Sequence, residues 1–298
     1  MKTVTRIAAF IVALATVFAA SLWIGKAVGP DGTAAPDHPA PAAAAEQPGG
    51  LRSTQDGYTL HLSESIYPAA AETPLRFHIL DDSGAPVTRY DEAHEKLLHL
   101  IVVRNDLTAY QHVHPVLDSS GTWRVPVNLS RAGDYRVFAD FVPTDGPALT
   151  LGANIHVAGQ YEPQPLPAAN AVSEVDDYAV TLSGTPKAGQ ESTLTLSVTR
   201  DGVAVDDLQP YLGAYGHLVA LRAADLAYLH VHPMGAPGDG VTGAGPEIEF
   251  HTTFPSTGDY RLFLDFQHDG VVRTAAFTVS VAGSGQEPSD SSEGDHGH

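Results

Sequence analysis

Gly133-Asp-Tyr-Arg-Val-Phe-Ala-Asp-Phe141 and Gly258-Asp-Tyr-Arg-Leu-Phe-Leu-Asp-Phe266 are two copies of one nine-residue pattern in this chain. After the glycine, apolar side chains alternate with polar ones and then form a short apolar run. This pattern, with its aromatic residues, is typical of a β-strand that buries one face or both. The stretch therefore predicts two equivalent strands in two equivalent places.

The surrounding sequence repeats in the same order, so the repeated unit is much longer than one strand. His99-Leu-Ile-Val-Val-Arg104 corresponds to His217-Leu-Val-Ala-Leu-Arg222, and Ala109-Tyr-Gln-His-Val-His-Pro115 to Ala227-Tyr-Leu-His-Val-His-Pro233. Each unit has about 100 residues, the size of a whole domain. The short strands, bounded by Gly, Pro, Asp and Ser, and the Gly-Asp-Tyr triplets resemble an immunoglobulin-like sandwich with its tyrosine corner. The predicted fold class is all-β: two tandem immunoglobulin-like or cupredoxin-like antiparallel β-sandwiches after an N-terminal apolar helix.

Composition changes along the chain predict the domain boundaries. Lys2 and Arg6 precede an uncharged run from Ile7 to Gly25, which predicts a signal anchor or a cleaved signal peptide. Pro-rich joints carry little that could be buried, so we expect the two domains to fold independently. The predicted segments are a signal anchor or signal peptide (1–26), an Ala/Pro-rich linker (27–50), a first β-sandwich (51–160), a Pro-rich joint (161–171), a second β-sandwich (172–283) and a disordered acidic, His-containing tail (284–298).

The charge balance restricts the partners of the chain. Lys and Arg total 16 against 35 Asp and Glu, a formal net charge of −19. Such a chain repels phosphate backbones, so nucleic acid is not expected as a partner, whereas cations are. The chain has no cysteine and 15 histidines, so a metal site must be built from imidazole and carboxylate.

A three-histidine motif recurs with identical spacing in both units. The copies are His99, His112, His114 and His217, His230, His232. Two histidines separated by one residue on a strand point to the same face. If the strand from Gln111 to Val116 pairs with the one from Leu97 to Val103, the first three imidazoles converge. Such a cluster suits Cu(II), Zn(II) or Ni(II), and the affinity order favours Cu(II).

Asp140 and Asp265 are fourth candidate ligands, because each is a charged residue inside an otherwise apolar strand. A buried carboxylate needs a partner, which can be a metal ion, a histidine of the motif or an arginine. A structural explanation remains open for the whole motif: the histidines can be hydrogen-bonded scaffold residues that stabilise a turn. Catalysis is not predicted, because the chain has no Gly-x-Ser-x-Gly elbow, no cysteine nucleophile and no phosphate-binding glycine loop.

The repeated His-Val-His-Pro motif resembles that of a group of secreted or membrane-anchored bacterial proteins with tandem β-sandwich domains and, more distantly, cupredoxin-like and copper-resistance β-sandwich proteins. This resemblance covers residues 51–283 and implies copper binding or trafficking by the histidines named above. We therefore expect a non-enzymatic metal-binding protein, single-pass in the cell membrane with its bulk extracytoplasmic or secreted after cleavage. It would buffer or deliver copper, with an envelope metal-handling protein as a further partner. The alternative is a structural or interaction module of the cell envelope without metal.

Overall fold

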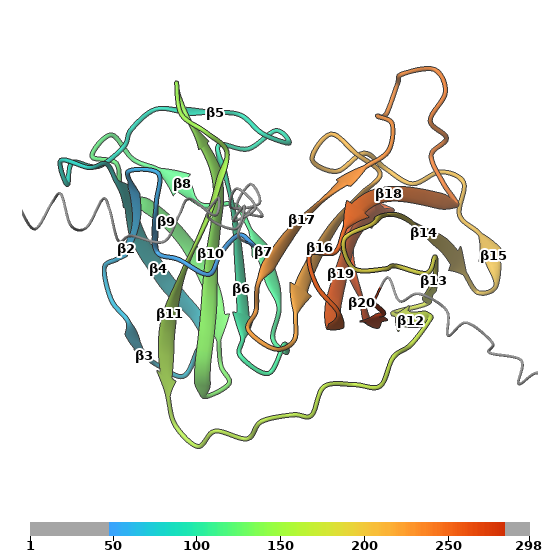
Figure 1. The fold of residues 1–298 in the computed structure, drawn as a ribbon, viewed down its shortest axis with the longest axis horizontal. Coiled ribbons are helices and arrows are strands. Elements are labelled where there is room, and N and C mark those ends of the chain that lie inside the picture. Colours follow the sequence, from blue (N-terminus) through green and yellow to red (C-terminus); the bar gives the residue numbers. More distant parts are fainter. Residues whose placement is uncertain (1–47, 284–298) are drawn as a thin grey trace, which may run out of the picture. The chain divides into compact units, whose positions relative to one another are not determined.

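A computed structural model describes residues 48–283, without the side chains of His230 and His232 (Figure 1). The predicted signal segment, most of the predicted linker and the predicted tail lie outside the described residues. Residues 48–283 form strands and no helix, so this described part of the chain has no helix that could cross a membrane. The all-β prediction is confirmed.

The strands are, in chain order, β1 (Thr54–Gln55), β2 (Tyr58–Leu62), β3 (Ile66–Pro68), β4 (Ala70–Leu80), β5 (Tyr90–Asp91), β6 (Leu98–Arg104), β7 (Gln111–Val113), β8 (Val116–Leu117), β9 (Trp123–Leu129), β10 (Gly133–Pro143), β11 (Leu149–Ala158), β12 (Val172–Val175), β13 (Tyr178–Ser183), β14 (Glu191–Arg200), β15 (Val203–Ala204), β16 (Gly216–Arg222), β17 (Tyr228–Pro233), β18 (Glu247–Thr253), β19 (Gly258–His268) and β20 (Val271–Val281).

The first sandwich consists of two sheets, with strand orders β1-β2-β4-β9-β8 and β3-β11-β10-β6-β7; β5 adds to β10. Strand β9 is buried at every second residue, as expected for a strand with one face on a core. Phe77, Trp123 and Tyr135 fill the space between the sheets and are almost completely buried. These side chains are the apolar halves of the alternating patterns seen in the sequence.

The second sandwich follows the same plan with one difference in connectivity. Its strands join in the order β12-β13-β14-β18-β17-β16-β19-β20, because β17 pairs with β16 at one end and with β18 at the other. In the first sandwich the corresponding segment is split into β7 and β8, which belong to different sheets. The predicted strand from Gln111 to Val116 is therefore wrong in its length, because β7 ends at Val113 and the next strand, β8, begins only at Val116.

Both predicted tyrosine corners are confirmed. The Tyr135 hydroxyl donates to the carbonyl oxygen of Arg131 at 2.7 Å, and the Tyr260 hydroxyl donates to that of Ser256 at 3.1 Å. Each bond joins the start of a long strand to the turn before it, at equivalent positions. The two units are thus immunoglobulin-like in this detail as well as in their sheets.

A third apolar cluster contains residues of both sandwiches. Tyr110 of the first and Phe263 of the second stack with ring centroids 3.9 Å apart and planes 5° from parallel. The expectation of independent domains did not include this shared cluster, because it considered only the joint. The buried members are Ile101, Val103, Leu107, Phe138, Val219, Leu221, Leu226, Tyr228 and Phe263.

The last residues of the predicted linker bond to both sandwiches. The carbonyl oxygen of Gly49 accepts from the Tyr228 amide at 3.0 Å, and the Gly50 amide donates to Thr150 at 2.8 Å. Gly50 has a positive φ of 73°, and a Cβ there would lie 2.3 Å from a ring carbon of Phe138. Only glycine fits this position, so the chain enters the folded region through a fixed contact.

Candidate metal centre

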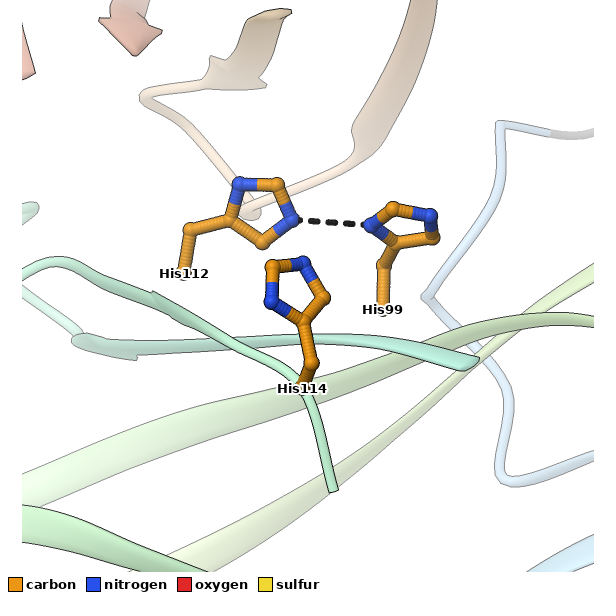
Figure 2. Close-up of side chains that lie close together, drawn as sticks. All are labelled: His99, His112 and His114. Carbon is orange, nitrogen blue, oxygen red and sulfur yellow. Dashed lines mark hydrogen bonds between the residues drawn. The ribbon is translucent and has the colours of Figure 1, made fainter. Parts of the chain in front are cut away.

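Three imidazoles of the first repeat converge next to the shared cluster. One nitrogen each from His99, His112 and His114 lies within 4.8 Å of the other two, and Figure 2 shows the three rings facing one another. His99 comes from β6 and His112 from β7, where Ile101 opposes His112. His114 follows β7, on the segment that leaves the sheet at Pro115.

Each of the first two rings is held by a hydrogen bond on its outer side. His99 Nε2 lies 2.9 Å from the carbonyl oxygen of Ala93, which can only accept, so this nitrogen carries the proton. His112 Nδ1 lies 2.8 Å from a carboxylate oxygen of Asp265, so this nitrogen donates. In neutral rings the remaining nitrogens, His99 Nδ1 and His112 Nε2, then both carry lone pairs.

These two lone-pair nitrogens lie 3.0 Å from each other (Figure 2). Two lone pairs at this distance repel, so a positive particle must lie between them. The particle can be a proton, which makes one ring an imidazolium, or a metal ion. A tetrahedral Zn(II) ion with bonds of 2.0–2.1 Å spaces its ligand nitrogens about 3.3 Å apart, close to the separation observed.

His114 supplies the third nitrogen. Its Nε2 is buried and has no hydrogen-bond partner among the described residues. Burial, followed by the neighbouring His112 and His99, lowers the pKa of His114 to about 3. Burial also lowers the pKa of His99 to about 4. Both rings are therefore neutral near pH 7, which is the form that binds a metal ion.

The two predicted acidic ligands have different surroundings. Asp265 lies on β19 and contacts His112, while its other oxygen accepts from the Thr274 hydroxyl at 2.6 Å. Asp140 lies on β10 opposite His99 and accepts from Tyr228 at 3.4 Å and Thr150 at 3.3 Å. Neither carboxylate belongs to the converging group of three nitrogens. The sequence analysis left open whether the partner of Asp265 is a metal ion, a histidine of the motif or an arginine; the partner is His112, a histidine of the other unit.

The second repeat matches the first wherever its side chains are described. His217 Nε2 donates to the carbonyl oxygen of Leu212 at 3.0 Å, as His99 does to Ala93, and burial lowers the pKa of His217 to about 3. The His217 ring lies 6.2 Å from the ring of His99, between centroids. The backbone of His230 opposes Val219, in the register of His112 and Ile101, and that of His232 opposes His251. The ring of His217 in the second motif thus lies close to the first motif.

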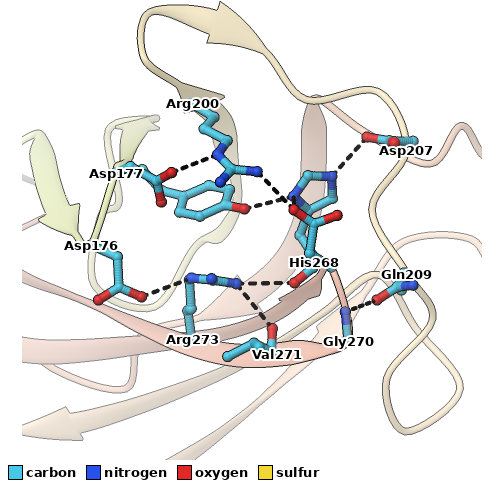
Figure 3. Close-up of polar contacts among 11 residues, drawn as sticks. Asp176, Asp177, Arg200, Asp207, Gln209, His268, Gly270, Val271 and Arg273 are labelled. Atoms are coloured by element: carbon cyan, nitrogen blue, oxygen red, sulfur yellow. Dashed lines mark hydrogen bonds and ion pairs between the residues drawn. The ribbon is translucent and has the colours of Figure 1, made fainter.

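His268 is a buried hydrogen-bonding centre in the second sandwich (Figure 3). Its Nδ1 accepts from the Tyr178 hydroxyl at 2.7 Å, and its Nε2 donates to Asp207 at 2.9 Å. The guanidinium groups of Arg273 and Arg200 lie over the Tyr178 ring. Every nitrogen of this histidine has a protein partner, so the cluster is a structural network.

Comparison with solved structures returns chains of low similarity. The Escherichia coli adhesin FdeC is 15% identical, over 77% of this chain and 65% of its own, with a TM-score of 0.26. Yersinia pseudotuberculosis InvD is 15% identical, over 77% and 58%, with a TM-score of 0.25. Domains 5–6 of the surface-layer protein SbsC are 13% identical, over 76% and 98%, with a TM-score of 0.23. The chain thus spans 65% of the length of the FdeC chain and 58% of the length of the InvD chain.

A search of curated proteins finds no match. The resemblance to cupredoxin-like and copper-resistance proteins has no support in these matches. A family model does match, twice, over residues 53–161 and 173–283. Because the two matches cover most of the chain, it belongs to the family described as "Domain of unknown function (DUF8832)", of which it carries two tandem copies.

Proposed function

We propose that the chain is an extracytoplasmic β-sandwich protein that binds a divalent transition-metal ion through His99, His112 and His114. One observation carries the proposal. His99 Nδ1 and His112 Nε2 both carry lone pairs and lie 3.0 Å apart, while the other nitrogen of each ring donates to a protein acceptor. The Nε2 of His114, which has no hydrogen-bond partner within residues 48–283 as described, adds a third ligand nitrogen. A metal ion would satisfy all three nitrogens at once, whereas one proton satisfies two.

The chemistry of the donors limits the metal. Neutral imidazoles bind Cu(II), Zn(II) and Ni(II), and the general affinity order favours Cu(II) where it is available. Three protein ligands leave a coordination position for solvent or for a partner's donor. This supports exchangeable binding, as buffering or delivery requires. The sequence supports a site outside the cytoplasm through its N-terminal basic and apolar segment, and it offers no catalytic motif that would make the protein an enzyme.

The second candidate function is a structural or interaction module of the cell envelope with no metal. The specific observation in its favour is the continuous chain of hydrogen bonds Ala93–His99–His112–Asp265, which a single extra proton completes. The His112 imidazolium beside the Asp265 carboxylate would then be a buried ion pair. The immunoglobulin-like fold fits this function without any ligand.

Calorimetric titration with Zn(II) and Cu(II) separates the two candidates. The full chain in mild detergent, with His296→Ala and His298→Ala to remove tail binding, should show saturable binding, and His114→Ala should lower its stoichiometry by one ion. His156→Ala is the matched control, because His156 is an exposed histidine that donates to Asp134 at 2.8 Å. A stoichiometry that is unchanged in His114→Ala, or a wild-type chain without saturable binding, would leave the metal-free module as the function.

A further inference from the structure

A single carboxylate of the second sandwich reaches the histidine group of the first. Asp265 Oδ2 lies 2.8 Å from His112 Nδ1, and both side chains are at least 95% buried. The Thr274 hydroxyl on the neighbouring strand β20 fixes the other oxygen, Oδ1, at 2.6 Å. The second sandwich therefore holds this carboxylate in place and presents one oxygen to a histidine 153 residues earlier in the chain.

This contact decides which nitrogen of His112 faces the other histidines. An acceptor at Nδ1 keeps the proton there and leaves the lone pair on Nε2, the nitrogen that faces His99. Without the carboxylate, the ring can take the other tautomer or rotate, and the converging set loses one donor. Carboxylates that accept from a metal-binding histidine act in this way in many metal sites.

The same two segments also carry the aromatic contact between the sandwiches. Tyr110 precedes His112 by two residues and Phe263 precedes Asp265 by two, and these two rings stack at 3.9 Å. Residues two apart on a strand share a face, so on β19 the stack and the carboxylate belong to one surface. Packing of the sandwiches and orientation of His112 thus depend on the same surface of β19.

We infer that Asp265 is the positioning residue of the His99–His112–His114 site, so that metal binding and packing of the two sandwiches are one coupled equilibrium. The inference rests on the proposed function. Coupling of this kind is reciprocal: the packed arrangement raises metal affinity, and bound metal stabilises the packed arrangement to the same extent. The second sandwich is then a required part of the first sandwich's site.

The test uses the full chain with the tail substitutions described above and Zn(II) as the probe. Asp265→Asn should weaken Zn(II) binding by about 10- to 100-fold, the usual effect of removing an outer partner of a metal ligand. Asp134→Asn is the matched control, since it removes an exposed carboxylate from a His–Asp pair of the same length, and it should leave the affinity unchanged. If Asp265→Asn does not fold, Thr274→Val frees the carboxylate without removing it and should lower the affinity about tenfold.

Amide hydrogen exchange supplies a readout that a merely structural carboxylate would not change. Zn(II) bound to the wild-type chain should slow exchange in β19 and β20 of the second sandwich as well as in β6 and β7. An affinity within twofold of wild type in the folded Asp265 or Thr274 variant, or protection confined to the first sandwich, would overturn the inference. A wild-type chain that binds no Zn(II) would instead remove the proposed function on which the inference rests.

Discussion

Replacing His114 by leucine should stabilise the metal-free protein. The Nε2 of His114 is buried and has no hydrogen-bond partner in the part of the chain that the structure describes, and an unsatisfied buried polar atom costs about 1–3 kcal/mol. Leucine removes that atom while keeping an apolar side chain of similar size. Allowing for imperfect repacking, we expect the free energy of unfolding to rise by about 1 kcal/mol.

Metal should reverse this order. At a Zn(II) concentration 100 times the dissociation constant, the wild-type protein gains about 2.7 kcal/mol, whereas the variant, which lacks one ligand, gains little. Urea unfolding can be followed by the fluorescence of Trp123, which is 1% exposed in the core of the first sandwich, with Trp23→Phe to remove the second tryptophan. A loss of 1–3 kcal/mol in metal-free His114→Leu would refute the reasoning, because it would mean that the ring makes a stabilising hydrogen bond.

Three further predictions concern neighbouring residues. His112→Leu should lower the free energy of unfolding of the metal-free protein by about 1.5–3 kcal/mol in the same urea assay, because it leaves the buried Asp265 carboxylate without its histidine. An unchanged free energy of unfolding would mean that the pair contributes nothing to stability. Phe263→Ala should cost about 3–5 kcal/mol by calorimetric melting, since it removes a buried ring that stacks across the two sandwiches, and a loss below 1 kcal/mol would contradict the shared cluster. Burial raises the pKa of Asp106, but hydrogen bonds led by that from Arg104 outweigh it and hold the pKa at about 2. This pKa lies below the value of 3.8 for the unfolded chain, so the ionised carboxylate stabilises the folded protein by about 2 kcal/mol above pH 4. That stabilisation is lost as the pH falls through 2, and Asp106→Asn should remove this part of the acid dependence of unfolding.

The fold could be predicted from the sequence because its signals are local. Alternation along Trp123–Leu129 identifies a strand with one buried face, and the Gly-Asp-Tyr triplets identify both tyrosine corners. The convergence of His99 with His112 could also be predicted, since it follows from pairing of two strands close in sequence.

The contact between the sandwiches could not be predicted in the same way. The His112–Asp265 pair joins residues far apart in sequence, and it exists only because the two sandwiches pack through one particular surface. A signal was nevertheless present: all seven residues of β6 (Leu98–Arg104) are buried, and a strand that is apolar on both faces needs a partner on each. The continuous apolar run Leu100-Ile-Val-Val103 therefore indicated a covered outer face, although not what covers it.

The central claim is that a metal ion, and not a proton, lies between His99 Nδ1 and His112 Nε2. The most direct measurement is diffraction from Zn(II)-soaked crystals at the zinc absorption edge. We predict an anomalous peak about 2.0–2.1 Å from those two nitrogens and from His114 Nε2. Crystals that show no peak there, with the two nitrogens still hydrogen-bonded at 3.0 Å, would contradict the claim and assign the position to a proton.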